Sequence, residues 1–138
     1  MDKQKEKEAQ KTYMELQLLE QQMKQLQKNA KLLDGQLEEL YSVLQNIDDF
    51  RNVAKKTPLW VPLSSGIFAK AELSENTELM VNVGADIAVK KSIPDAKSLV
   101  QSQMDDLRKV HNQVMEELQR IAVRAMGLEK ELNRLLSE

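Results

Sequence analysis

Few residues of this 138-residue chain could support acid–base, nucleophilic or metal chemistry. The pairs Glu38-Glu39, Asp48-Asp49 and Asp105-Asp106 provide neighbouring carboxylates, and His111 is the only histidine. The absence of cysteine excludes thiolate metal ligands and a disulfide framework, and a single histidine excludes a paired-histidine metal site. The four glycines are scattered and form no phosphate-binding loop. The sequence therefore predicts no catalytic residue, metal site or cofactor, and we do not expect an enzyme.

The acidic pairs fall in segments that the apolar pattern predicts to be long helices, where neighbouring charges are typical of a solvated face. The first predicted helix covers residues 5–54. Its apolar residues recur alternately three and four positions apart, which is the heptad pattern of a coiled coil. These residues, which we call the first seam, are Leu16, Met23, Ala30, Leu37 and Leu44 with Leu19, Leu26, Leu33, Leu40 and Ile47.

The second predicted helix covers residues 93–137 and repeats the heptad pattern. Ser92 and Asp95 resemble a capping box, and Pro94 suits a first helical turn. His111 falls among the heptad residues, where we interpret it as a polar group that fixes the register, a pH-sensing role being the alternative. The residues of this second seam are Met104, His111, Leu118, Ala125 and Leu132 with Leu107, Val114, Ile121, Leu128 and Leu135.

Between the helices, in residues 58–92, apolar side chains alternate with the period of two that is typical of strands. Turn-forming residues divide this insert into four short strands, which we interpret as two β-hairpins. Because isolated hairpins are marginally stable and free strand edges pair with other chains, we expect an assembly module. Strands of several subunits would close into a barrel-like body. The candidate assembly residues are Val61, Leu63, Ile67, Phe68, Leu73, Leu79, Val81, Val83, Ile87 and Val89.

The predicted fold is therefore mainly α. It is a long antiparallel two-helix coiled coil with two β-hairpins inserted between the helices, forming a single domain over residues 1–138. The 20 basic and 22 acidic residues are interspersed, so no one-sided basic surface for nucleic acid is expected. No apolar run is long enough to cross a membrane, and the polar start does not resemble a signal peptide. We expect a soluble, cytoplasmic protein.

Several apolar residues near the ends of the two helices lie outside both seams. A thin two-helix arm gives them no obvious packing role, and unbranched methionine suits adaptable contacts. Two interpretations of these residues stay open: a patch that binds a partner, or scattered surface hydrophobic residues of the kind that are normal on soluble proteins. The first eleven residues are highly polar, so we expect the extreme N-terminus to be a poor contact. The candidates are Tyr13, Met14, Leu18, Val123, Met126 and Leu136.

Two segments of the insert resemble the linker hairpins of the prefoldin family. They are residues 61–73, VPLSSGIFAKAEL, and residues 81–91, VNVGADIAVKK. The resemblance covers nearly the whole chain. Alpha-class subunits of that family carry two hairpins and beta-class subunits carry one, so the chain is similar to the alpha class.

The resemblance implies an α2β4 hexamer with beta-class prefoldin subunits, in which a β-barrel body carries coiled-coil arms. It implies an ATP-independent holdase that captures unfolded client proteins at the tips of the arms and delivers them to a group II chaperonin. The apolar candidates near the helix ends would then be client contacts, and the hairpin residues would carry assembly. The alternative is a structural coiled-coil adaptor that binds one specific helical partner.

Overall fold

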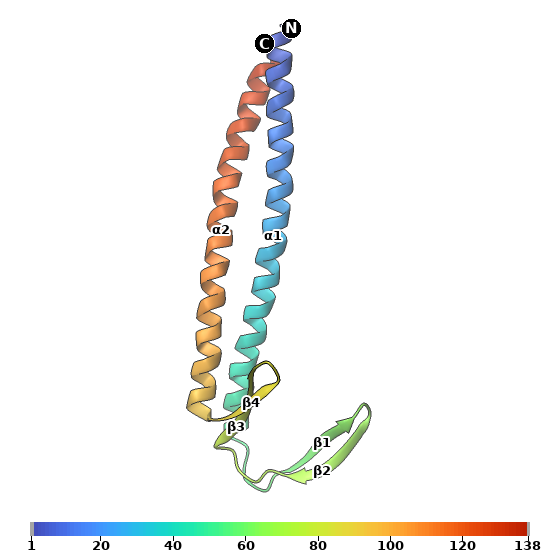
Figure 1. The fold of residues 1–138 in the computed structure, drawn as a ribbon, viewed down its shortest axis with the longest axis vertical. Coiled ribbons are helices and arrows are strands. Elements are labelled where there is room, and N and C mark those ends of the chain that lie inside the picture. The colour runs from blue at the N-terminus through green and yellow to red at the C-terminus, as the bar shows by residue number, and fades with distance from the viewer. Residues whose placement is uncertain (1, 138) are drawn as a thin grey trace. The chain divides into compact units, whose positions relative to one another are not determined.

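The computed structural model describes residues 2–137, and it confirms the predicted fold class of two long helices with two β-hairpins between them (Figure 1). The chain divides into two units. We call residues 2–37 with 107–137 the terminal unit, and Glu38–Asp106 the hairpin unit. The elements in chain order are α1 (Lys3–Arg51), β1 (Pro58–Ser64), β2 (Ile67–Glu72), β3 (Glu78–Gly84), β4 (Ile87–Ser92) and α2 (Ile93–Ser137).

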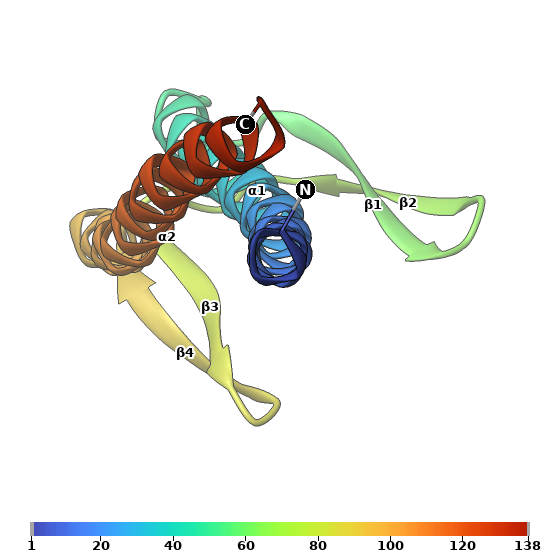
Figure 2. The same ribbon diagram turned by 90° about the horizontal axis from the view of Figure 1, so that it is seen from above.

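In the terminal unit, the first turns of α1 lie beside the last turns of α2, so the two helices are antiparallel (Figures 1 and 2). Every residue of the two seams in this unit is buried or half-buried, as a coiled coil requires. The first seam continues toward the helix start, because Ala9 and Thr12 hold the same heptad positions and are buried. The helix begins at Lys3 instead of residue 5, since the Gln4 N–H donates to Asp2 Oδ1 at 3.3 Å and caps the first turn.

In the hairpin unit, side-chain caps mark both helix ends. Helix α1 ends at Arg51, and the Asn76 Nδ2 donates to the carbonyl oxygens of Arg51 at 2.8 Å and of Val53 at 2.9 Å. Helix α2 begins directly after Ser92, whose Oγ accepts the Asp95 N–H at 3.2 Å, as the sequence predicted. Both caps satisfy backbone groups that a helix leaves without an internal partner. They therefore fix where the hairpins leave and enter the helices.

The two hairpins are repeats of one another, offset by twenty residues. Strand β1 pairs with β2 and β3 with β4, both antiparallel, and the two resulting sheets do not pair with each other. The Trp60↔Lys70 pair corresponds to Met80↔Lys90, and each hairpin has an irregularity at the equivalent place. Backbone bonds at the base also match. The residues that recur are Thr57, Leu59, Val61, Ile67 and Lys70, repeated as Thr77, Leu79, Val81, Ile87 and Lys90.

The bonds at the base of the hairpins run from the Leu73 N–H to the Thr57 oxygen at 3.0 Å and from the Ile93 N–H to the Thr77 oxygen at 3.2 Å. Leu73 and Ile93, which follow the second strand of their hairpins, are both buried. The same apolar anchor and the same backbone bond thus close each hairpin. The strands are two per sheet, so no closed barrel exists within residues 2–137.

Candidate binding surfaces

The acidic pairs that the sequence offered for acid–base chemistry lie on exposed helix surfaces. All six carboxylate residues are exposed, and Asp48 Oδ1 forms an ion pair with Lys97 Nζ at 2.7 Å within the hairpin unit. Within residues 2–137, no group of three or more histidine, cysteine or acidic residues could hold a metal ion. Over the same residues, no helix is both long and apolar enough to span a membrane. The exposed apolar side chains are therefore the features that a functional site can be built from.

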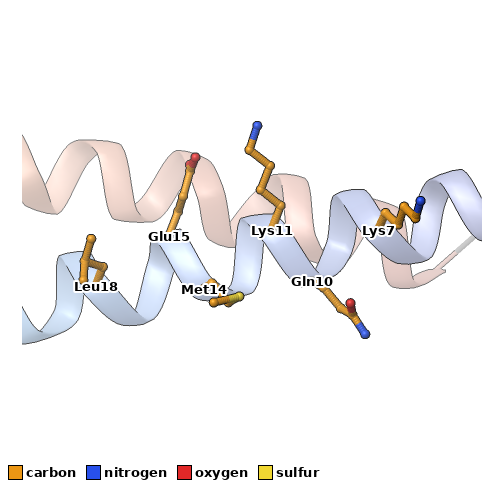
Figure 3. A pocket seen from close by; sticks show the side chains of 6 residues that line it. All are labelled: Lys7, Gln10, Lys11, Met14, Glu15 and Leu18. Atoms are coloured by element: carbon orange, nitrogen blue, oxygen red, sulfur yellow. The ribbon is translucent and has the colours of Figure 1, made fainter.

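All six apolar candidates of the terminal unit are exposed, but the structure separates them into different surfaces. Met14 and Leu18 line one depression on α1, with exposed fractions of 68% and 59% (Figure 3). We call this depression the α1 strip. Its other lining residues are polar or charged: Lys7, Gln10, Lys11 and Glu15.

Val123 and Met126 line a second depression, to which both helices of the terminal unit contribute. We call it the methionine hollow, and none of its lining residues is charged. Met115 belongs to it and was missed by the sequence reasoning. The sequence did contain a signal for this residue, because Met115 lies outside the seam and on the same face of α2 as Met126. The full lining is Met23, Gln27, Met115, Leu118, Gln119, Ala122, Val123 and Met126.

The remaining two candidates, Tyr13 and Leu136, line neither depression. The Tyr13 Oη accepts a hydrogen bond from Gln17 Nε2 at 3.0 Å, so its ring lies along α1 with its polar end already satisfied. Leu136 is exposed near the end of α2. The structure thus brings four of the candidates together in two pairs and leaves Tyr13 and Leu136 exposed outside both depressions.

The hairpin candidates differ in exposure. Leu73 is buried at the base of its hairpin, and Leu79 and Val81 are half-buried. The other seven project into solvent: Val61, Leu63, Ile67, Phe68, Val83, Ile87 and Val89.

Cross-strand partners share a face of a hairpin, and this places Trp60 and Phe68 together on one face of the first hairpin. The opposite face carries the half-buried Leu59, Ala69 and Ala71. Trp60 is 69% exposed, and its counterpart Met80 in the second hairpin is 62% exposed. Neither Trp60 nor Met80 was predicted as an assembly residue. Each directly precedes a predicted assembly residue, Val61 or Val81, and therefore lies on the opposite face of its strand.

An antiparallel pair of heptad helices joined by two hairpins with exposed apolar faces defines a coiled-coil assembly subunit. Comparison with known families agrees, because the model of the prefoldin family, described as "Prefoldin subunit", matches residues 19–138. The chain belongs to the prefoldin family, and it is a prefoldin-type chaperone subunit.

Several curated relatives are prefoldin alpha subunits of archaea. The Pyrococcus horikoshii protein is 28% identical over 104 residues, which cover 75% of this chain and 70% of that protein. The Archaeoglobus fulgidus protein is 21% identical over 127 residues, covering 92% of this chain and 93% of that protein. A filamentous prefoldin from Methanocaldococcus jannaschii, solved by cryo-EM, has a TM-score of 0.72 at 15% identity. That likeness covers 84% of this chain and 96% of that chain and shows the shared fold.

Proposed function

We propose that this chain is the alpha-class subunit of a prefoldin complex that holds unfolded proteins without ATP and delivers them to a group II chaperonin. The observation that carries the proposal is the exposure of large apolar side chains on the terminal unit, whose seams are already filled. Met14, Val123 and Met126 are each at least 60% exposed, although the helices pack without them.

Exposed apolar area of this kind supports binding to unfolded chains. Fully burying one such side chain against a client contributes about 1.5–3 kcal/mol, and partial burial contributes less. Methionine is flexible and polarisable, so a surface built from Met115 and Met126 can adapt to clients of different sequence. Weak contacts of this kind become strong binding when several arms of one complex engage the same chain. These properties favour a holdase over an adaptor that recognises one helix.

The hairpins support the assembly part of the proposal. A pair of two-stranded sheets is marginal alone, and exposed Trp60 and Phe68 leave an apolar face in water. Pairing these hairpins with those of beta-class subunits would close the strands into a barrel body and cover that face. We propose the α2β4 hexamer as the functional assembly. The filamentous structural relative makes self-assembly the alternative state, and native mass spectrometry of the co-expressed subunits distinguishes the two.

The test is suppression of aggregation of a chemically denatured protein by the assembled complex in the absence of nucleotide. The wild-type complex should suppress aggregation at about stoichiometric ratio. Replacing Met115, Val123 and Met126 together by serine should weaken suppression, because the methionine hollow loses its apolar lining. The matched control replaces Leu32 and Val110, which are also exposed in the terminal unit but lie outside both depressions, and it should leave suppression unchanged.

Two outcomes contradict the proposal. If the wild-type complex gives no suppression, the chain is not a holdase subunit. If one single serine replacement abolishes binding of one particular partner and general suppression is absent, the adaptor alternative is correct. Delivery is tested separately, by adding a group II chaperonin with ATP to the client-loaded complex and measuring recovered client activity.

A further inference from the structure

The two apolar depressions of the terminal unit differ in charge. The methionine hollow has no charged lining residue, whereas the α1 strip is bordered by Lys7, Lys11 and Glu15. Successive positions of the strip at residues 7, 11, 14 and 18 are four, three and four apart, so they share one face of α1. Figure 3 shows the two lysines toward the start of the helix and the apolar Met14 and Leu18 further along.

The charges at the border of the strip do not cancel. The Glu15 Oε2 lies 4.0 Å from the Arg124 Nη2, so its carboxylate already faces a cation on α2. Neither Lys7 nor Lys11 has an ion-pair partner within residues 2–137. The strip is therefore an apolar surface with a net positive end, and that end lies within the first eleven residues, which the sequence suggested were too polar to be a contact.

We propose that the α1 strip prefers unfolded segments in which carboxylates lie next to apolar side chains. The apolar side chains would cover Met14 and Leu18, and the carboxylates would pair with Lys7 and Lys11. The alkyl stems of the two lysines extend the apolar surface while their ammonium groups stay in water. This inference rests on the proposed capture function and names the class of client that the α1 strip selects. The methionine hollow, which has no charged lining residue, should bind apolar segments whatever their charge.

The magnitude of the preference follows from the exposure of the groups. An ion pair between exposed charges contributes little, so two such pairs should give a preference of about threefold to tenfold. The preference should decline with added salt, because exposed charges are screened. A modest preference suits a holdase, because it favours binding of acidic client segments at this strip and still permits release of the client.

The test measures binding of two fluorescent peptides to the complex assembled from the full chain and a beta-class subunit. The peptides have the same leucine spacing and differ only in having aspartates or lysines between the leucines. The wild-type complex should bind the acidic peptide about threefold to tenfold more tightly at low salt. Replacing both lysines, Lys7→Glu with Lys11→Glu, should reverse the order of the two affinities.

The matched control is Lys24→Glu with Lys28→Glu. These lysines are on the same helix, four residues apart and exposed, so the change in net charge and spacing is identical. The control should keep the wild-type order, and circular dichroism should show equal helix content in both variants.

Equal affinity for the two peptides in the wild-type complex, or the same reversal in the control, overturns the charge preference and leaves the capture function standing. Failure of both peptides to bind overturns the capture function as well. Tight binding of vesicles of anionic phospholipid with no preference between the peptides would show that the strip serves a membrane surface, and this also overturns the proposal.

Discussion

His111 Nε2 lies 2.9 Å from Asp34 Oδ1 and joins the two helices of the terminal unit. The histidine side chain is 22% exposed and that of Asp34 is 60% exposed, so the polar member of the second seam reaches its partner at the solvent edge. A single polar group at such a position specifies the register of a coiled coil at a cost in stability. The contact between the two helices therefore supports the register role of His111.

Replacing this histidine, His111→Leu, should raise the free energy of unfolding of the isolated chain by about 1 kcal/mol. A leucine buries more apolar area in the seam, while the lost pair contributes only about 0–1 kcal/mol because Asp34 is exposed. Urea unfolding followed by circular dichroism measures the change. Asp34→Asn is the control, and it should change stability by less. A clear loss of stability in His111→Leu would show that the ion pair outweighs leucine burial.

Asn76 should be a stability determinant of the hairpin unit. Its side chain donates to the carbonyl oxygens of Arg51 and Val53, so Asn76→Ala removes both bonds and should cost about 1–2 kcal/mol. Asn76→Asp should cost more, since it places a carboxylate against two carbonyl oxygens. Hydrogen exchange at the Lys56 and Leu73 amides should become faster in both variants.

The control for this substitution is Asn82→Ala, which removes a single bond from the exposed Gly84 N–H. It should leave exchange at the base of the first hairpin unchanged. Exchange rates in Asn76→Ala equal to those of the wild type would mean that the backbone bonds alone hold the loop between the hairpins.

Replacing glycine by alanine should raise the stability of the chain at one position and lower it at another. Gly35 lies inside α1 with open space around it, so Gly35→Ala should stabilise the chain by about 0.5–1 kcal/mol through helix propensity. Gly84 has φ +111°, a conformation that alanine adopts with strain, so Gly84→Ala should destabilise it by about 1–3 kcal/mol. Thermal unfolding midpoints of the two variants, compared with the wild type, check the signs. Two shifts in the same direction would contradict this explanation.

Removing the exposed aromatic face of the first hairpin should abolish assembly without unfolding the chain. Trp60 and Phe68 are 69% and 56% exposed, so replacing both by serine removes few contacts within the subunit. Native mass spectrometry after co-expression with a beta-class subunit should then show free subunits, with helix content retained. The control Leu32→Ser, on α1, should assemble normally. Assembly of the double variant at wild-type mass would place the interface on the other hairpin faces.

The sequence by itself determined the helices, the seams and the two hairpins. Heptad spacing leaves little freedom, because one displaced residue would turn Ile121 or Leu135 out of the seam and into water. Helix and strand periods also differ clearly enough to separate the insert from the arms. The cap at Ser92 was predictable for the same reason, since it depends on residues that are adjacent in the sequence.

Only the tertiary structure decided which exposed residues form a surface together. Met115 and Met23 come from different helices, and their meeting in one depression depends on the antiparallel register, which no local pattern encodes. The hairpin register likewise put Trp60 and Phe68 together on one exposed face. The net positive charge of the α1 strip depended on the pairing of Glu15 with Arg124, a contact between residues far apart in the chain. Local periodicity fixes which side of an element is apolar, whereas cross-element contacts decide which side chains remain free to bind.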